Sequence, residues 1–280
     1  MELNKRIRGI EIPQRMSGLP LSDEGYPVPY FVPWVTGDDG HRRPEFRGMD
    51  SEKFFYAIRN KRCWLCGQPL GKYMCFPIGP MCAVTRTTAE PPSHLECAVY
   101  GARACPFLTQ PRMRRNERDL PEHRHVAGIA IKRNPGCIVL WSCTEYKLFR
   151  APNGGYLFTV GEPTSVEVWA EGRLATLSEL TESIRTGYPL LEAIATQDGD
   201  DAELQLRLAR AMEILKIRPE MMFLADRGEE IDDPGDSGSG NGGTARGEDA
   251  PSAQARDPGA EPEPSPQPLG GPEVRQSEGQ

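Results

Sequence analysis

Two pairs of metal-ligand residues constrain this chain more than any other feature of its sequence. Cys63 and Cys66 form a C-x-x-C pair followed by Gly67, a spacing that lets two thiolates meet one metal ion across a tight turn. His94 and Cys97 form a second pair, and their i, i+3 spacing points both side chains to one side of a helix. Four ligands of these types complete a tetrahedral site, so the sequence predicts one structural zinc ion bound by all four.

The segment around the second pair predicts how the two ligands are positioned. Ser93 and Glu96 match the S-x-x-E capping box, which predicts that a helix begins immediately after the Pro91 and Pro92 dipeptide. Between the two ligand pairs, residues 73–76 and 82–85 are predicted to form a hairpin around a Pro-Ile-Gly-Pro turn. The expected order is therefore a cysteine knuckle, a hairpin and a helix with two ligands in its first turn.

This order resembles the treble-clef zinc finger over residues 63–105. The resemblance implies a fold and a bound metal ion. Treble clefs serve nucleic-acid binding, protein binding and nuclease chemistry, so the resemblance implies no single activity.

Three further cysteines compete for a place among the ligands. Cys75 and Cys82 lie between the two pairs, and Cys82 could approach the knuckle from its predicted strand. Cys105 lies eight residues after Cys97, which along a helix is a separation of about 12 Å, too far for one metal ion. A redox-active C-x-x-C is the other alternative, but such pairs favour a helix N-terminus, and the predicted helix precedes Cys63. Cys137 and Cys143 are expected to be small buried residues in a sheet.

The charge of the chain is distributed unevenly. The net charge of −7 hides a C-terminal segment, residues 226–280, with 13 acidic and four basic side chains and almost no apolar ones. That composition predicts a disordered acidic tail. Residues 59–118 instead contain ten basic and three acidic side chains. We expect nucleic acid, DNA or RNA, to bind this basic region through Arg103, Arg112, Arg114, Arg115 and Arg118.

The remaining patterns predict an α+β fold. A short edge strand is expected at residues 30–35, a helix at 51–60, and a small antiparallel β-meander of about four strands at 126–169, with 136–141 the most buried strand. Thr176 and Glu179 predict a capped helix that ends at Gly187. Pro189 then opens a second helix, and Asp200 or Asp201 caps a third, in which Glu203 and Arg207 pair. The predicted segments are an irregular N-terminus (1–50), the zinc module with its basic extension (51–118), the antiparallel β segment (119–172), the C-terminal helices (173–225) and the tail (226–280).

Two other functions stay open at this point. The first is an adaptor that binds another protein through the sheet, the helices or the tail. The second is an HNH-type nuclease, for which His41, His123 and His125 are the histidines left over, although no paired catalytic residues accompany them. No signal-peptide pattern, membrane span or small-molecule substrate site is predicted, so we expect a cytoplasmic protein.

Several short motifs also resemble uncharacterised proteins encoded by bacteriophages and their high-GC actinobacterial hosts. These motifs are CWLCG at 63–67, IGPMC at 78–82, EPPSHLEC at 90–97, ACPFL at 104–108 and PRM at 111–113. The resemblance spans most of residues 25–217. It implies a prophage-linked origin and supplies no activity.

Overall fold

A four-stranded antiparallel sheet lies at the centre of the protein. The structure is a computed structural model, and it describes residues 2–110, 134–152 and 154–224 of the chain. The strand order is β3-β5-β8-β9. Their bounds are Met74–Ile78 for β3, Ile138–Cys143 for β5, Pro163–Ala170 for β8 and Arg173–Leu174 for β9. The strand nearest the predicted metal ligands, β3, is thus hydrogen-bonded to a strand about 60 residues later in the chain.

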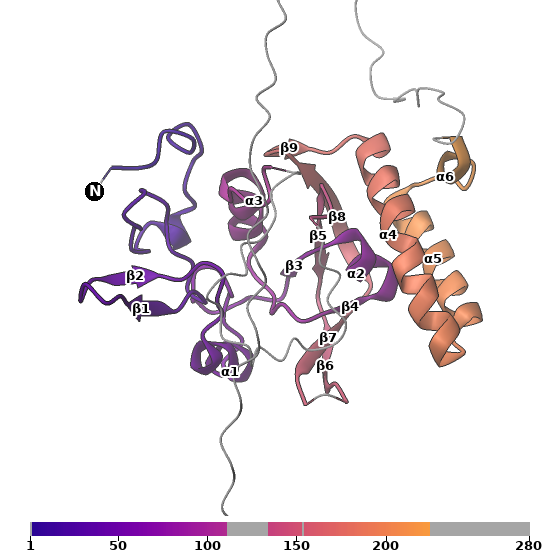
Figure 1. Ribbon diagram of the computed structural model, residues 1–280, viewed down its shortest axis with the longest axis horizontal. Coiled ribbons are helices and arrows are strands. Elements are labelled where there is room, and N and C mark those ends of the chain that lie inside the picture. The colour runs from indigo at the N-terminus through magenta and orange to yellow at the C-terminus, as the bar shows by residue number, and fades with distance from the viewer. Residues whose placement is uncertain (1, 111–133, 153, 225–280) are drawn as a thin grey trace, which may run out of the picture. The chain divides into compact units, whose positions relative to one another are not determined.

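Helices cover both faces of this sheet (Figure 1). On one face lies α3, Leu95–Ala104, and on the other lie α2, α4 and α5, with bounds Pro80–Thr85, Leu177–Asp198 and Asp201–Leu215. Every residue of β5 is buried, as the sequence predicts. Its side chains alternate: Ile138 and Leu140 pack with α3, whereas Val139 and Trp141 join the cluster that contains α2, α4 and α5. A continuous apolar strand is the pattern expected when both faces are covered.

The predicted meander is wrong in its connectivity, although its four strands exist. Strands β6 and β7, Tyr146–Arg150 and Tyr156–Val160, pair with each other and leave the central sheet. They join β4, Thr87–Thr88, in a second sheet of order β4-β7-β6. Strand β8 returns to pair with β5, and the first part of the predicted meander, residues 126–133, lies outside the described residues. Pairing with partners from earlier in the chain is what separates the four strands into two sheets.

In the C-terminal helical segment, the start of the first helix and the last helix match the prediction, but the predicted break between the first and second helices is absent. Thr176 and Glu179 form the predicted capping box at the start of α4. The predicted stop at Gly187 is wrong, because α4 continues through Gly187 and Pro189 and ends only before Gly199, which has a φ of 75°. Burial of the Gly187 turn against the core outweighs the local helix-breaking tendency of these two residues. In α5, Glu203 and Arg207 pair at 2.8 Å, as predicted.

The N-terminal part has little regular structure. It contains a single 3-10 turn, Gln14–Met16, and a two-stranded hairpin of β1, Trp34–Thr36, with β2, Arg42–Pro44. The predicted strand at 30–35 therefore begins later, after Pro33. Helix α1, Ser51–Arg59, matches the prediction and is capped by the Asp50 carboxylate, which accepts a hydrogen bond from the Lys53 amide. A short helix α6, Met221–Leu224, contacts α4. The predicted tail, 226–280, lies outside the described residues.

Candidate metal centre

The first ligand pair lies on a tight knuckle that follows α1. The Cys63 amide donates to the Gln68 carbonyl and the Gly67 amide donates to the Cys63 carbonyl, both at 2.8 Å. Gly67 has a φ of 73°, and a Cβ atom there would lie 2.7 Å from the ring of Tyr30. Only glycine satisfies both the backbone conformation and the close approach of this ring. The glycine after the C-x-x-C pair is therefore required for the knuckle to close.

The second ligand pair lies at the start of α3. His94 is the N-cap residue and Cys97 is in the first turn, so the predicted i, i+3 arrangement is present. The predicted capping box is wrong: the Ser93 hydroxyl is buried without a hydrogen-bond partner, and Glu96 pairs with Arg15 at 2.7 Å. Ser93 lies one residue before the N-cap, so its side chain is not placed to accept from the third helical amide.

Backbone pairing holds the two ligand pairs together. The Trp64 amide of the knuckle donates to the Pro92 carbonyl at 3.1 Å. On the other side, Ser93 forms an antiparallel bridge with Cys75 of β3. The predicted hairpin of residues 73–76 with 82–85 is wrong, because residues 80–85 form α2 and β3 pairs with β5. A C-x-x-C turn and a helix that begins at the second ligand pair are thus present, but the hairpin expected for a treble clef is not found in the described residues; Cys75 and Ser93 form only a single bridge.

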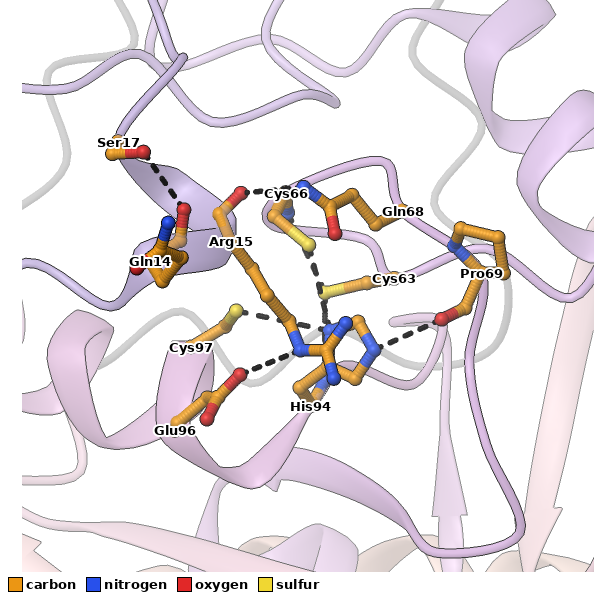
Figure 2. Close-up of polar contacts among 10 residues, drawn as sticks. All are labelled: Gln14, Arg15, Ser17, Cys63, Cys66, Gln68, Pro69, His94, Glu96 and Cys97. Atoms are coloured by element: carbon orange, nitrogen blue, oxygen red, sulfur yellow. Dashed lines mark hydrogen bonds and ion pairs between the residues drawn. The ribbon is translucent and has the colours of Figure 1, made fainter.

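The four predicted ligand atoms converge on one point (Figure 2). The three Sγ atoms of Cys63, Cys66 and Cys97 and one ring nitrogen of His94 all lie within 4.8 Å of one another. His94 Nδ1 is 3.4 Å from Cys66 Sγ and 3.8 Å from Cys97 Sγ. Zinc bond lengths of about 2.0 to 2.3 Å imply tetrahedral edges of roughly 3.5 to 3.8 Å between ligand atoms. The cluster is therefore compatible with a zinc ion.

The second nitrogen of the histidine ring fixes which atom faces the cluster. His94 Nε2 lies 3.0 Å from the Pro69 carbonyl oxygen, which is only an acceptor, so Nε2 carries the proton and donates. Nδ1 then presents its lone pair to the sulfur atoms. Histidines that bind metal ions usually donate their other ring N–H to a carbonyl or carboxylate in this way. Pro69 belongs to the chain just after the knuckle, so the knuckle orients the ligand on α3.

The electrostatics of the cluster favour one thiolate among protonated thiols. Cys63 Sγ accepts backbone N–H groups from Cys66 and His94, both at 3.4 Å. Hydrogen bonds from the Cys66 and Cys97 thiols hold the pKa of Cys63 well below its usual range. The hydrogen bond with Cys63 raises the pKa of Cys66 to about 11 and also raises that of Cys97. A divalent cation is the group that would allow all three sulfur atoms to be thiolates together.

The N-terminal segment covers the cluster. Ile7 and Met16 are buried against the three cysteines together with Tyr100 of α3. Gln68 donates to the Arg15 carbonyl at 3.2 Å, while the Arg15 side chain reaches Glu96. The sequence patterns did not predict these contacts, because the segment is irregular and its partners lie more than 50 residues away.

The competing cysteines lie outside the cluster. Within the described ranges, the four residues above form the one group of three or more Cys, His, Asp or Glu side chains close enough to hold a metal ion. Cys75 lies on β3, where burial raises its pKa to about 12, and Cys82 lies on α2, where burial raises its pKa to about 11. Cys105 follows the last turn of α3. Cys137 and Cys143 are buried in the core, as predicted.

The predicted nucleic-acid contacts are only partly described. Arg103 is exposed on the last turn of α3. Arg112, Arg114, Arg115 and Arg118 lie outside the described residues, as do His123 and His125. His41 is exposed between β1 and β2 and does not belong to the cysteine cluster.

Comparisons with known proteins supply no family. No family description, curated protein or solved structure matches the chain. None of the helices in the described ranges is long and apolar enough to cross a membrane. The site must therefore be interpreted from its own chemistry.

Proposed function

We propose that Cys63, Cys66, His94 and Cys97 bind one zinc ion and that this ion has a structural role. The convergence of three sulfur atoms and one nitrogen within 4.8 Å carries the proposal. Thiolate and imidazole ligands suit zinc, whereas magnesium and calcium prefer oxygen. Four protein ligands fill a tetrahedral shell and leave no position for water or substrate, which distinguishes structural from catalytic zinc.

The ion would add a direct link between the knuckle and α3, which otherwise meet through hydrogen bonds such as that from the Trp64 amide to the Pro92 carbonyl. Two ligands come from the knuckle and two from the start of α3, and Ile7 and Met16 of the N-terminal segment are buried in the same cluster as the three cysteines. Structural zinc contributes roughly 10 to 16 kcal/mol of apparent binding free energy in finger peptides, which is comparable to the stability of a whole domain. We therefore expect this part of the protein to fold as a treble-clef-like module only with metal bound.

Elemental analysis of the purified full chain tests this proposal. We expect one zinc ion per chain, and loss of the metal in a Cys97→Ser variant. Cys105→Ser, just after the last turn of α3, is the control and should keep the ion. A wild-type protein without zinc, or a Cys97→Ser variant that retains it, would contradict the proposal.

We further propose that the zinc module binds DNA or RNA through basic residues, with Arg103, Arg112, Arg114, Arg115 and Arg118 as the predicted contacts. Its support is the excess of basic over acidic side chains in residues 59–118. Affinity should fall steeply with salt and weaken when Arg112, Arg114 and Arg115 are changed to Ala. A flat salt response would favour the alternative, an adaptor that binds another protein.

Neither nuclease activity nor phage origin gains support from the site. The described residues hold no second cluster of histidines and carboxylates at which a nuclease metal could bind. Cleavage of DNA or RNA with added divalent metal, abolished by His123→Ala or His125→Ala, would favour an HNH-type enzyme instead. The phage resemblance stays a prediction from the short motifs.

A further inference from the structure

The cationic side chains of the described residues differ in whether they have a carboxylate partner. Most arginines have a carboxylate partner within 4.0 Å, including Arg86 with Glu162 and Arg173 with Glu179. Around the knuckle the pattern differs. Within the described part of the chain no ion pair is found for four cations there: Arg59, Lys61, Arg62 and Lys72. Arg59, Lys61 and Lys72 are exposed and available to neutralise an external anion, whereas Arg62 is half-buried and donates to the Gly67 carbonyl at 3.5 Å.

Backbone pairing places these four cations on the two segments that enter and leave the knuckle. Arg59 is in the last turn of α1, and Lys61 and Arg62 lead from α1 into the first zinc ligand. The chain leaving the knuckle returns alongside: Arg62 forms a bridge with Pro69, and the Leu70 amide donates to the Lys61 carbonyl at 2.8 Å. Lys72 follows two residues later, so its Cα lies within about 8 Å of that of Leu70.

Two exposed tyrosines accompany the cations. Tyr56 is 48% exposed and Tyr73 is 63% exposed, the second a large value for an aromatic side chain. The Arg62 guanidinium lies 5.8 Å from the Tyr56 ring centroid, and Lys72 Nζ lies 5.7 Å from that of Tyr73. We name these six residues the knuckle surface: Tyr56, Arg59, Lys61, Arg62, Lys72 and Tyr73.

Three carboxylates close to this surface in the sequence or the fold, Glu52, Glu90 and Asp50, are not paired with its cations within the described residues. Glu52 is in the first turn of α1, seven residues before Arg59, which is about 10 Å along the helix. Glu90 accepts a hydrogen bond from the Trp64 indole at 3.0 Å. Asp50 is engaged by Lys53 and by the amide that it caps.

We propose that the knuckle surface binds single-stranded nucleic acid, with the cations on phosphates and the two tyrosines stacked on unpaired bases. Cations interleaved with exposed aromatic rings are the combination that single-strand binding proteins use. A duplex keeps its bases paired and stacked, so it would use the cations and not the rings. This inference rests on the proposed nucleic-acid function and assigns it a surface other than Arg103 and residues 112–118.

Fluorescence anisotropy with a labelled oligothymidine tests the proposal on the full, zinc-loaded chain. We compare wild type with the triple variant Arg59→Ala, Lys61→Ala, Lys72→Ala, which leaves Arg62 and its packing intact. Loss of three phosphate contacts should lower the slope of log affinity against log salt by about 2. The control triple, Arg6→Ala, Arg42→Ala, Lys147→Ala, removes three exposed cations elsewhere and should leave the slope unchanged.

Substitution of an exposed tyrosine distinguishes base stacking from the contribution of charge to binding. Tyr73→Ala should weaken binding to the single strand by about 5-fold or more, with little change for a duplex of the same length. Equal weakening for both, or a wild-type preference for the duplex, would overturn the single-strand assignment. Unfolding curves and zinc content of each variant establish that the fold is retained.

The outcomes also distinguish this inference from the proposed function. If wild type binds and only the Arg112, Arg114 and Arg115 substitutions weaken it, the knuckle surface is wrong and nucleic-acid binding stands. If wild type binds neither strand form at low salt, both proposals fail. If the knuckle triple variant loses affinity and the control triple does not, the surface is assigned.

Discussion

Cys75 and Ser93 exchange two backbone hydrogen bonds, of 2.8 and 2.7 Å, and this bridge ties β3 to the residue just before the ligand His94. Strand β3 is paired with β5 along its whole length. The position of the second ligand pair is therefore fixed by the central sheet as well as by the knuckle.

The first prediction concerns the side chain of Ser93, whose hydroxyl is buried without a partner. Ser93→Ala should leave the free energy of unfolding unchanged or raise it by up to about 1 kcal/mol, because an unsatisfied buried hydroxyl is removed. Thr176→Ala is the contrasting variant: its hydroxyl accepts from the Glu179 amide at 3.2 Å, so we expect a loss of about 1 kcal/mol. Urea unfolding of the zinc-loaded proteins measures both, and a comparable loss in Ser93→Ala would restore the predicted capping role.

A second prediction compares two glycines near the knuckle. Gly67→Ala places a Cβ atom 2.7 Å from the Tyr30 ring at a positive φ, so unfolding free energy should fall by about 2 kcal/mol or more. Gly71→Ala meets no atom within 4 Å and has no positive φ, so stability should stay within about 1 kcal/mol of wild type. Thermal unfolding with zinc present measures the difference. Equal behaviour of the two variants would mean that the knuckle does not require this conformation.

The pH dependence of α4 gives a third prediction. The hydrogen bond with Arg173 lowers the pKa of Glu179 from 4.5 to about 2. A lowered folded-state pKa stabilises the fold above about pH 4.5, and this stabilisation is lost as the pH falls through the folded value. Glu179→Gln should therefore be less stable than wild type at pH 6, by about 1 kcal/mol, and the difference should shrink towards pH 2.5.

The measured quantity is the difference in unfolding free energy between wild type and Glu179→Gln, because loss of the proposed zinc ion in acid would destabilise both proteins equally. Glu203→Gln on α5 is the control, since the Glu203 side chain is 54% exposed and its pair with Arg207 contributes little. A constant difference between wild type and Glu179→Gln from pH 6 to pH 2.5 would contradict the assignment.

Metal removal gives the fourth prediction. Because Ile7 and Met16 are buried in one cluster with Cys63, Cys66 and Cys97, a chelator should release the N-terminal segment and open its backbone to trypsin at Arg8 and Arg15. Cleavage after Arg207 in the middle of α5 should stay slow, since α5 packs on α2 and α4 away from the cluster. Mass spectrometry of timed digests reads both sites. Protection of Arg15 that persists without metal would show that the segment folds independently of zinc.

Local signals predicted the elements that depend on neighbouring residues. The C-x-x-C pair with Gly67, the Asp50 cap of α1 and the Thr176 capping box all involve contacts within four residues, where sequence spacing determines geometry. The same signals predicted the four residues that converge in the cluster. In the knuckle and the two caps the interacting groups belong to one turn, whereas the cluster joins two such turns.

Long-range packing decided what the patterns did not predict. A proline and a glycine predicted a break at Gly187, but burial of that turn keeps α4 continuous. A turn sequence predicted a hairpin around residues 77–80, but β3 pairs with β5 instead, and Pro80 begins α2, where its missing N–H and fixed φ are favourable. The pairing of β3 with β5 and the cover of Ile7 and Met16 on the cysteines involve partners without a local signature.

The pairing of β3 with β5 has a consequence for how the chain acquires its structure during synthesis. All four metal ligands leave the ribosome before β5 does, since the last of them is Cys97 and β5 begins at Ile138. A zinc ion bound by these four residues, as we propose, would therefore close the knuckle on the helix while β3 still lacks its neighbour in the sheet. Metal capture would then precede sheet formation, and an exposed β3 edge would await its partner for several seconds at ordinary elongation rates of about 5 to 20 residues per second.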